Sequence, residues 1–360
     1  MVFRLPIICL IVMACLFSCK EKTAFYTSDD FEKAPKTDAH FHYNTSDSRY
    51  LKYAVSLNIR LISINVDTEM DIDSQLQITS SLKHQFPDNF AFLGTFTVDS
   101  FGKKGFAERT IARIDQSMKA GASGIKIWKN IGMVLKDTSG KYVMVDDPAF
   151  TPVFNYLEAN HIPLTAHLGE PKNCWLSDAE MTLDNDRRYY KKHPEYHMFL
   201  HPEAPTYQDQ IMARDNLLKE HPKLQMTGAH LASLEWSVDE LAKRFDRFPL
   251  MKADLAARIG QLQYQSLTNR ERIRNFLIKY QDRMVYGSDR TIDNFSTFDL
   301  KVCAGFRRAW FEHWAYMATD STFTVKDLGD QKVQGLNLPR EVVDKIFNKN
   351  AEQLFVNGKH

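Results

Sequence analysis

The sequence is poor in cysteine. Five of its 360 residues are cysteines, and three of these, Cys9, Cys15 and Cys19, fall within the first nineteen residues. The other two, Cys174 and Cys303, belong to no Cys-x-x-Cys pair. This spacing excludes a disulfide framework and argues against a thiolate metal site. Any metal in this protein would therefore be bound by nitrogen and oxygen atoms.

An excess of charge of one sign and glycine-rich phosphate loops are also absent. The 46 basic and 45 acidic side chains leave a net charge of +1, without the basic excess of a nucleic-acid-binding domain. No strand-like segment leads into G-x-G-x-x-G or G-x-x-x-x-G-K, which weakens a dinucleotide- or triphosphate-binding fold. A hydrophobic content of 44% and 24 phenylalanines instead indicate a folded protein with a large core.

The apolar run at the amino terminus differs from the rest of the chain. Residues 1–19, MVFRLPIICLIVMACLFSC, place Arg4 before an apolar stretch that is short for a membrane span, and they end in Ser18-Cys19. This pattern resembles a bacterial lipoprotein signal peptide, which is cleaved before a cysteine that then carries the lipid; an ordinary secretory signal is the alternative. We expect an exported, membrane-anchored lipoprotein that faces the periplasm or the cell surface, with residues 20–36 as a polar tether.

Eight short apolar segments recur in the remaining chain, and most are followed by an amphipathic stretch. They are residues 37–42, 60–66, 90–98, 123–128, 162–169, 224–233, 250–258 and 283–290. Strands that alternate with helices favour parallel βα units, and eight such units predict a closed barrel. We therefore expect an α/β fold in which residues 37–357 form a TIM (β/α)8 barrel.

One connection in this pattern is unusually long. Residues 171–206 separate the fifth predicted strand from its helix. In a barrel, an insertion at this point lies on the carboxyl-terminal rim, where active sites are found. We expect this insertion to form a lid or a wall of a pocket.

Several predicted strands carry polar side chains where a barrel should be apolar. Two imidazoles share one face of the first strand, and an amine, two imidazoles and a carboxylate lie near the ends of strands four, five, six and eight. These residues are His40, His42, Lys126, His167, His230 and Asp289. Each alone has an ordinary explanation as a core residue with its own polar partner. Together they would need six separate buried partners, whereas one or two divalent cations would satisfy them all.

In these residues the sequence resembles the amidohydrolase superfamily, and more closely its amidohydrolase-2 branch. The segments that carry the resemblance are DAHFH, GIKIW, AHLGEP, GAHLASLEWSVDELAKRFDRFP, YGSDR and KNAEQLF. The resemblance implies a site for one or two divalent metal ions, and zinc is the leading candidate ahead of manganese, iron or nickel. The implied ligands are His40, His42, His167, His230 and Asp289. In two-metal members a carboxylated lysine bridges the ions, and Lys126 holds that position; in one-metal members Lys126 would instead bind a substrate carboxylate.

The activity that the resemblance implies is hydrolysis of an ester, lactone or amide bond in a small molecule. Asp289 would accept the proton of the attacking water, and His230 would orient or protonate the developing oxyanion. Arg258, Glu170 and Trp175 are the candidates for substrate binding at the rim. Of these, Arg258 suits a substrate carboxylate best.

Two other functions stay open. The amidohydrolase-2 branch includes metal-dependent decarboxylases of aromatic or unsaturated acids with the same ligands, and a single metal with an unmodified Lys126 would favour that reaction. A lipoprotein that binds a ligand without turnover is the third alternative. We expect a small molecule as the partner, no nucleic acid, and contact with a membrane only through the lipid; the sequence is compatible with a homo-oligomer.

Overall fold

A nine-stranded parallel sheet forms the centre of the structure, a computed structural model that describes residues 24–68, 70–293 and 298–357. The strands lie in the order β8-β7-β6-β5-β4-β3-β2-β1-β9. They are β1 (Lys36–Tyr43), β2 (Ile59–Ile64), β3 (Phe90–Thr95), β4 (Ile125–Ile127), β5 (Leu164–Ala166), β6 (Met226–Gly228), β7 (Lys252–Asp254), β8 (Met284–Val285) and β9 (Arg290–Ile292). Each of the eight predicted strand segments overlaps a strand, in the predicted order.

The barrel closes through its last strand, which is interrupted. β8 pairs with β7 and β9 pairs with β1, and only residues 286–289 lie between β8 and β9. Across the interruption the Ala39 N–H donates to the Tyr286 carbonyl (3.0 Å), and the Asp289 N–H donates to the His40 carbonyl (2.8 Å). β8 and β9 are therefore two pieces of one eighth strand, and the predicted TIM (β/α)8 barrel is confirmed.

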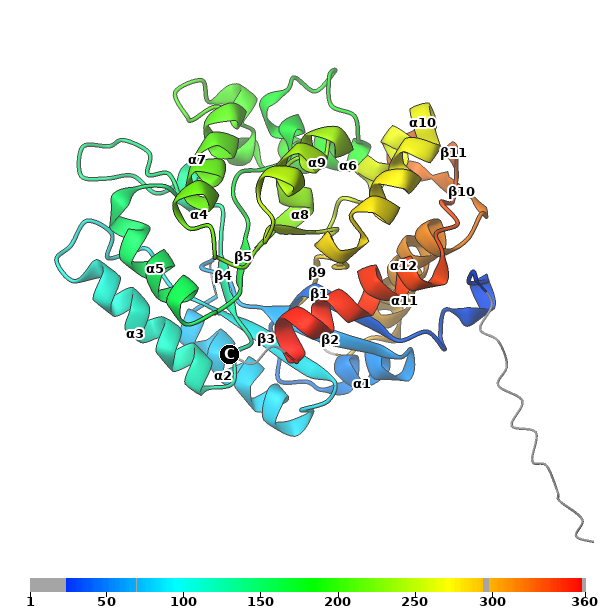
Figure 1. The fold of residues 1–360 in the computed structure, drawn as a ribbon, viewed down its shortest axis with the longest axis horizontal. Helices are drawn as coiled ribbons and strands as arrows, with labels where there is room; N and C mark the ends of the chain where they lie inside the picture. The colour runs from blue at the N-terminus through cyan, green and yellow to red at the C-terminus, as the bar shows by residue number, and fades with distance from the viewer. Residues whose placement is uncertain (1–23, 69, 294–297, 358–360) are drawn as a thin grey trace, which may run out of the picture.

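Helices surround the strands on the outside (Figure 1). The α-helices are α1 (Arg49–Ser56), α2 (Ile72–Gln85), α3 (Phe106–Lys119), α4 (Asn130–Met133), α5 (Thr151–Ala159), α6 (Asp184–Lys192), α7 (Tyr207–Glu220), α8 (Ala229–Ala232), α9 (Val238–Arg247), α10 (Ile259–Lys279), α11 (Leu300–Ala318) and α12 (Arg340–Asp344). The 3-10 turns are η1 (Ser28–Asp30), η2 (Pro148–Phe150), η3 (Lys172–Trp175), η4 (Pro194–Tyr196), η5 (Met198–Leu200), η6 (Gln281–Arg283) and η7 (Lys326–Leu328). The π-helical segments η8 (Lys345–Lys349) and η9 (Glu352–Val356) follow α12. An antiparallel hairpin of β10 (Thr322–Val325) and β11 (Gln331–Gln334) contacts α10.

The sequence of β3 and α3 shows why these units pack as they do. All six residues of β3, FAFLGT, are buried, as expected for a parallel strand that is covered on both faces. The residues that α3 buries, Phe106, Thr110, Ile114 and Ser117, recur every three or four positions and form one face. A Cβ atom at Gly94 of β3 would lie only 2.5 Å from that of Ser117, so the close approach of helix and strand requires the glycine.

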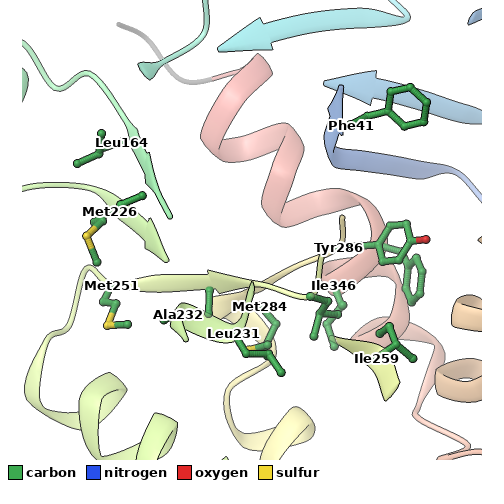
Figure 2. Packing of buried hydrophobic residues seen from close by; sticks show 14 of the residues in the cluster. Phe41, Leu164, Met226, Leu231, Ala232, Met251, Ile259, Met284, Tyr286 and Ile346 are labelled. Carbon is green, nitrogen blue, oxygen red and sulfur yellow. The ribbon is translucent and has the colours of Figure 1, made fainter. Parts of the chain in front are cut away.

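Apolar side chains cover the outer face of the barrel near the beginnings of its strands, toward the helices. Leu164, Met226, Met251 and Met284 lie at or just before the first residues of β5 to β8, and all four are fully buried. They belong to one apolar cluster with Ile346 of the carboxyl-terminal helix (Figure 2). This packing stabilises the amino-terminal end of the barrel and leaves the opposite end to polar groups.

The chain before β1 packs on the barrel from residue 24 onward. Phe31 is 1% exposed, and its ring meets those of Phe311 (centroids 5.4 Å apart) and Trp314 (5.7 Å) on α11. The Tyr26 hydroxyl donates to Asp344 Oδ1 (2.6 Å). The expectation that residues 20–36 form a tether is therefore corrected for its described part, because aromatic side chains in this polar segment bury themselves against the helix.

Residues 1–23, which include the predicted lipidation site Cys19, lie outside the described residues. Within the part of the chain that the structure describes, no helix has the length and apolar character needed to cross a membrane.

The long insertion after β5 has its own small core. It contains η3, α6, η4 and η5. The buried residues of this core are Met133, Cys174, Met181, Tyr190, Met198 and Ala204. Asn185, Asp186, Tyr189 and Tyr190 of α6 face a cavity at the carboxyl-terminal end of the strands. The insertion is therefore the expected wall of a pocket.

Replacing Phe31 tests the packing of the amino-terminal segment. Phe31→Ala should lower the free energy of unfolding by about 3 kcal/mol, since the substitution leaves a cavity against α11. Urea unfolding followed by circular dichroism measures this loss. Phe199→Ala is the matched control, because Phe199 is 50% exposed, and it should change stability by less than about 0.5 kcal/mol. Equal effects of the two substitutions would show that the segment does not contribute to the fold.

Candidate metal centre

Three imidazoles at the carboxyl-terminal end of the barrel have one ring nitrogen fixed by an acceptor. Nδ1 of His40 lies 2.7 Å from Asp254 Oδ2, Nδ1 of His42 lies 3.1 Å from the Ile64 carbonyl, and Nδ1 of His230 lies 3.0 Å from the Ala256 carbonyl. A carboxylate or a carbonyl can only accept, so in the neutral ring the proton sits on Nδ1. Each ring is therefore left with its lone pair on Nε2, which is the form that binds a metal.

Asp289 lies where two of these lone pairs converge. Its Oδ1 is 3.3 Å from Nε2 of His40 and 3.3 Å from Nε2 of His42. His40, His230 and Asp289 each offer one ligand atom, and these atoms all lie within 4.8 Å of one another. Asp289 follows β8 with a left-handed backbone (φ 60°), which helps to direct its carboxylate across the barrel mouth toward β1.

His167 joins the cluster from the end of β5. Its ring centroid is 4.2 Å from that of His230, in an edge-to-face contact. Its Nε2 is buried without a hydrogen-bond partner among the described residues, and lies 3.8 Å from Glu170 Oε2. An unpaired buried nitrogen is costly, and a cation would supply the missing partner. The structure thus brings all four predicted histidines and Asp289 to one place.

The protonation states in this cluster suit a metal. Burial lowers the pKa of His40 and of His230, and it lowers the pKa of His167 to about 4, which favours the neutral forms of these rings. For Asp289 burial acts to raise the pKa, but the imidazoles of His230, His40 and His42 outweigh it and hold the pKa well below its usual range. Neutral imidazoles and an ionised carboxylate are the forms that bind divalent cations.

Lys126 on β4 faces the same cavity with no partner for its amine. Its Nζ is buried and unbonded among the described residues, and the side chain is 1% exposed. Burial lowers the pKa of Lys126 to about 8, while Asp254 and Asp289 act in the opposite direction. The neutral amine needed for carboxylation is therefore accessible near pH 8, and the ammonium form would suit an anionic ligand.

Asp254 at the end of β7 is a site residue that the sequence analysis missed. Besides His40, it accepts the backbone N–H of His230 (2.7 Å) and that of Ala256 (3.1 Å) through Oδ1. Burial acts to raise its pKa, but His40 dominates, and the pKa of Asp254 is lowered to about 2. A charged residue at the end of a buried strand was the signal by which Lys126 was found, and it applies equally here.

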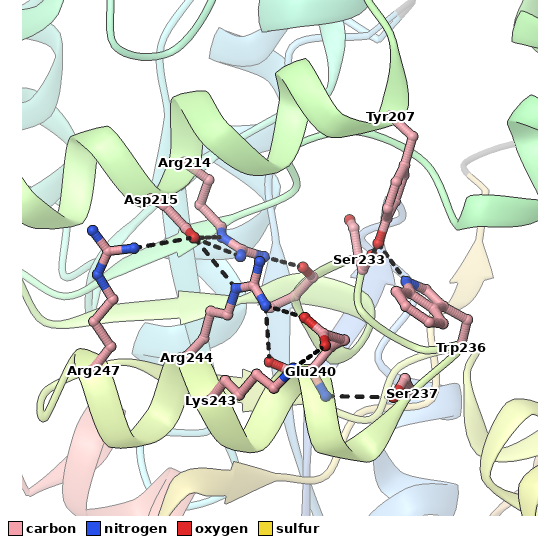
Figure 3. Close-up of polar contacts among 11 residues, drawn as sticks. Tyr207, Arg214, Asp215, Ser233, Trp236, Ser237, Glu240, Lys243, Arg244 and Arg247 are labelled. Atoms are coloured by element: carbon pink, nitrogen blue, oxygen red, sulfur yellow. Dashed lines mark hydrogen bonds and ion pairs between the residues drawn. The ribbon is translucent and has the colours of Figure 1, made fainter.

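The segment that carries His230 is a left-handed turn. Four consecutive residues, His230 to Ser233, have φ between 55° and 59°, which costs non-glycine residues energy. The Ser233 hydroxyl donates to the carbonyl of Leu168 (2.9 Å), at the end of the neighbouring strand. Figure 3 shows two further supports: Tyr207 of α7 donates to the Ser233 carbonyl, and Arg214 of α7 donates to the Ala232 carbonyl.

Arg214 is itself fixed by an ion-pair network between α7 and α9. Its guanidinium bonds to Asp215 Oδ1 (2.7 Å), and Arg244 of α9 reaches Asp215 Oδ2 (3.3 Å), as Figure 3 also shows. Arg214 is 2% exposed. The network outside the barrel therefore positions the backbone that aims His230 into it.

A cavity of about 480 Å³ opens beside the histidines, a volume suited to a small molecule. Its lining includes Arg258 and Glu170, two of the three predicted substrate-binding residues. Glu170 forms a buried ion pair with Lys129, which the sequence analysis did not single out. The third, Trp175, does not line the cavity: its Nε1 donates to the Pro205 carbonyl (3.2 Å) inside the insertion.

The sequence matches the amidohydrolase family, in its amidohydrolase-2 form, over residues 92–356, which is more than half of the chain. This chain belongs to the amidohydrolase family. The match covers β3 to the carboxyl-terminal helix, so it includes Lys126, His167, His230 and Asp289 but begins after His40 and His42. Membership of this amidohydrolase family indicates an enzyme of the general metal-dependent hydrolase type.

Three solved structures illustrate the neighbours of this amidohydrolase. An amidohydrolase II is 15% identical over 89% of this chain and 99% of its own, with a TM-score of 0.48. Dihydroorotase from Campylobacter jejuni is 13% identical over 89% and 83% (TM-score 0.42), and 4-oxalomesaconate hydratase from Rhodopseudomonas palustris is 11% identical over 89% and 95% (TM-score 0.48). The named activities are those of the neighbours. A search of curated proteins returned no match.

Asp254→Asn tests the role of the His40–Asp254 bond. An asparagine amide can donate to Nδ1 of His40 and so move the proton to Nε2, which would remove a ligand lone pair. Zinc affinity, measured by competition with a chromophoric chelator, should fall about 10- to 100-fold. Asp178→Asn removes the same charge from the exposed part of the insertion and should leave the affinity unchanged. If Asp254→Asn binds zinc as tightly as the unaltered protein, Asp254 does not orient the site.

Proposed function

We propose that this amidohydrolase is a metal-dependent hydrolase that directs a water molecule onto a C–O or C–N bond of a small molecule, as in an ester, lactone or amide. The observation that carries the proposal is the set of three Nε2 lone pairs, fixed by Asp254, Ile64 and Ala256, at the wall of a cavity that also holds Asp289. Such a preorganised set serves no purpose in packing.

The residues that would hold the cation are His40, His42, His167, His230 and Asp289, with Lys126 added for a second ion. Zinc suits this nitrogen-rich, thiolate-free set best. When bound, a divalent cation lowers the pKa of water from 15.7 to about 7 and polarises a carbonyl group. The orphaned Nε2 of His167 and the unbonded amine of Lys126 fit such an occupant.

Asp289 is the residue best suited to move the proton. Its carboxylate is ionised and 29% exposed toward the cavity, so it can accept the proton of the attacking water and later return it to the leaving group. His230 enters the reaction differently from the sequence-based expectation. Because its Nδ1 donates to Ala256, the neutral ring has no proton on Nε2 and can protonate an oxyanion only after gaining one.

A decarboxylase is the second candidate, and Lys126 is the observation that favours it. If its amine stays unmodified beside a single metal, the ammonium group can hold a substrate carboxylate next to the ion instead of bridging two ions. Release of CO2 from an aromatic or unsaturated acid would then replace hydrolysis. Intact-mass analysis under non-denaturing conditions detects a carboxylated lysine as an added CO2.

The proposed function is tested by metal analysis and a substrate screen of the purified chain without residues 1–19. The protein should contain one or two equivalents of transition metal, and a lactone, ester or amide should be turned over. Asp289→Asn and His230→Ala should lower kcat at least about 1,000-fold. His193→Ala is the control, because the His193 side chain is 45% exposed and bonded to Glu195. Activity that survives complete chelation would exclude the mechanism.

We also propose that the protein is exported and held at a membrane by a lipid on Cys19, as residues 1–19 suggest. In cells that express the full chain, the protein should fractionate with membranes, and Cys19→Ala should move it to the soluble fraction. Cys15→Ala, within the same segment, is the control and should not. Membrane association of Cys19→Ala would contradict the lipid anchor.

A further inference from the structure

Arg258 is buried at the cavity wall and forms no ion pair with any residue that the structure describes. The residue is 7% exposed and lies on the connection that follows β7. Within the described part of the chain its guanidinium makes one hydrogen bond, from Nη1 to the carbonyl of Ala257 (3.2 Å), and its Nε is buried with no partner. A guanidinium out of water is costly unless a carboxylate or a similar anion pairs with it.

Two of the carboxylates near Arg258, those of Asp186 and Glu170, are bound to other groups. Asp186 accepts hydrogen bonds from Asn173 (2.7 Å) and Gln261 (3.3 Å). Glu170 is paired with Lys129. These acids keep the guanidinium charged from a distance, yet neither forms an ion pair with it. The face of Arg258 that borders the cavity is therefore available to a ligand.

The position of Arg258 relates it to the proposed chemistry. It follows β7, between the strands whose ends carry His230 and Asp289, and all three side chains line one cavity. Ala257, which precedes it and also lines the cavity, has a left-handed backbone (φ 54°). This conformation is uncommon for alanine and sets the direction in which the Arg258 side chain leaves the chain.

We propose that Arg258 receives a carboxylate of the substrate, so that the enzyme acts on a small carboxylic acid whose reacting bond lies beside Asp289 and His230. The inference rests on the proposed function and names its substrate class. A planar guanidinium can hold a carboxylate in two parallel hydrogen bonds, which a lysine cannot form. The cavity of about 480 Å³ holds a small molecule that reaches both groups.

Glu235 offers a competing explanation for Arg258. Its Oε1 accepts the backbone N–H of Lys172 (2.8 Å), while its Oε2 is buried and unpartnered among the described residues. Burial raises the pKa of Glu235 to about 7, with Arg258 acting against the rise. If Arg258 served only to balance Glu235, removing it would lower stability and leave the choice of ligand unchanged. The two explanations therefore differ in whether removing Arg258 changes the preference for a ligand that carries a carboxylate.

The test is calorimetric binding of glutarate and of its uncharged diamide, glutaramide, to the zinc-loaded full chain. For each variant we compare the ratio of the two dissociation constants, which does not depend on the folded fraction. Arg258→Gln should reduce the preference for glutarate about 100-fold, and Arg258→Lys about 10-fold, because lysine keeps the charge but loses the fork. Arg188→Gln removes an arginine that is exposed on α6 and paired with Asp327, and should keep the preference of the unaltered protein.

A preference for glutarate that is the same in Arg258→Gln and in the unaltered protein would overturn the inference, as would an equal loss in Arg188→Gln. Because binding needs no turnover, this outcome is distinct from failure of the proposed function. If the protein hydrolyses a substrate through Asp289 but Arg258→Gln leaves the ratio of the two dissociation constants unchanged, the proposed function stands and the assigned substrate class is wrong.

Discussion

The carboxylate of Asp254 joins three strands at the point where the site is built. It accepts a hydrogen bond from Nδ1 of His40 on β1, and it accepts the backbone N–H groups of His230 and Ala256, which follow β6 and β7. A buried carboxylate is tolerated only with such partners. The three bonds therefore fix Asp254, and they also fix the His40 ring and the backbone of His230 and Ala256. Asp254 orients the His40 ring directly, and it also holds the backbone of His230 and of Ala256, whose carbonyl fixes the His230 ring. The Asp289 carboxylate lies 3.3 Å from the lone pair of His40 that is oriented in this way.

Strain and its compensation explain why this end of the barrel is rigid. A left-handed stretch of four residues costs roughly 1–2 kcal/mol per residue, and no glycine relieves it between His230 and Ser233. Tyr207 and Arg214 donate to the buried carbonyls of Ser233 and Ala232, and the ion pair with Asp215 holds the Arg214 guanidinium in place. A loop without these supports would relax to ordinary backbone angles and turn the imidazole away. Helices α7 and α9 thus contribute to the geometry of a site whose cavity they do not line.

The sequence predicted the barrel well, because period-two polarity and strand–helix alternation are local properties. It also selected residues that the structure brings together, since charged groups at the ends of buried strands are rare. Asp254 was missed although its segment, KADLAAR, belongs to the seventh predicted strand, because its bonds to His40 and His230 depend on residues far away in the sequence. The break in the eighth strand and the left-handed turn could not be predicted, because both depend on hydrogen bonds to residues far away in the sequence. The packing of Tyr26 and Phe31 was also missed, because the polar composition of residues 20–36 predicted a tether.

The insertion and the barrel strands supply different parts of the cavity wall. The imidazoles and Asp289 come from the barrel strands, whereas the facing residues Asp186 and Tyr189 come from α6 and pack on a core of their own. The two halves meet in specific contacts, such as the hydrogen bonds from Gln261 to Asp186 and from the Lys172 N–H to Glu235. A substitution on α6 can therefore change the shape of the cavity while the strands that carry the candidate metal ligands stay as they are. The range of molecules that fit can change in this way without a change in the barrel.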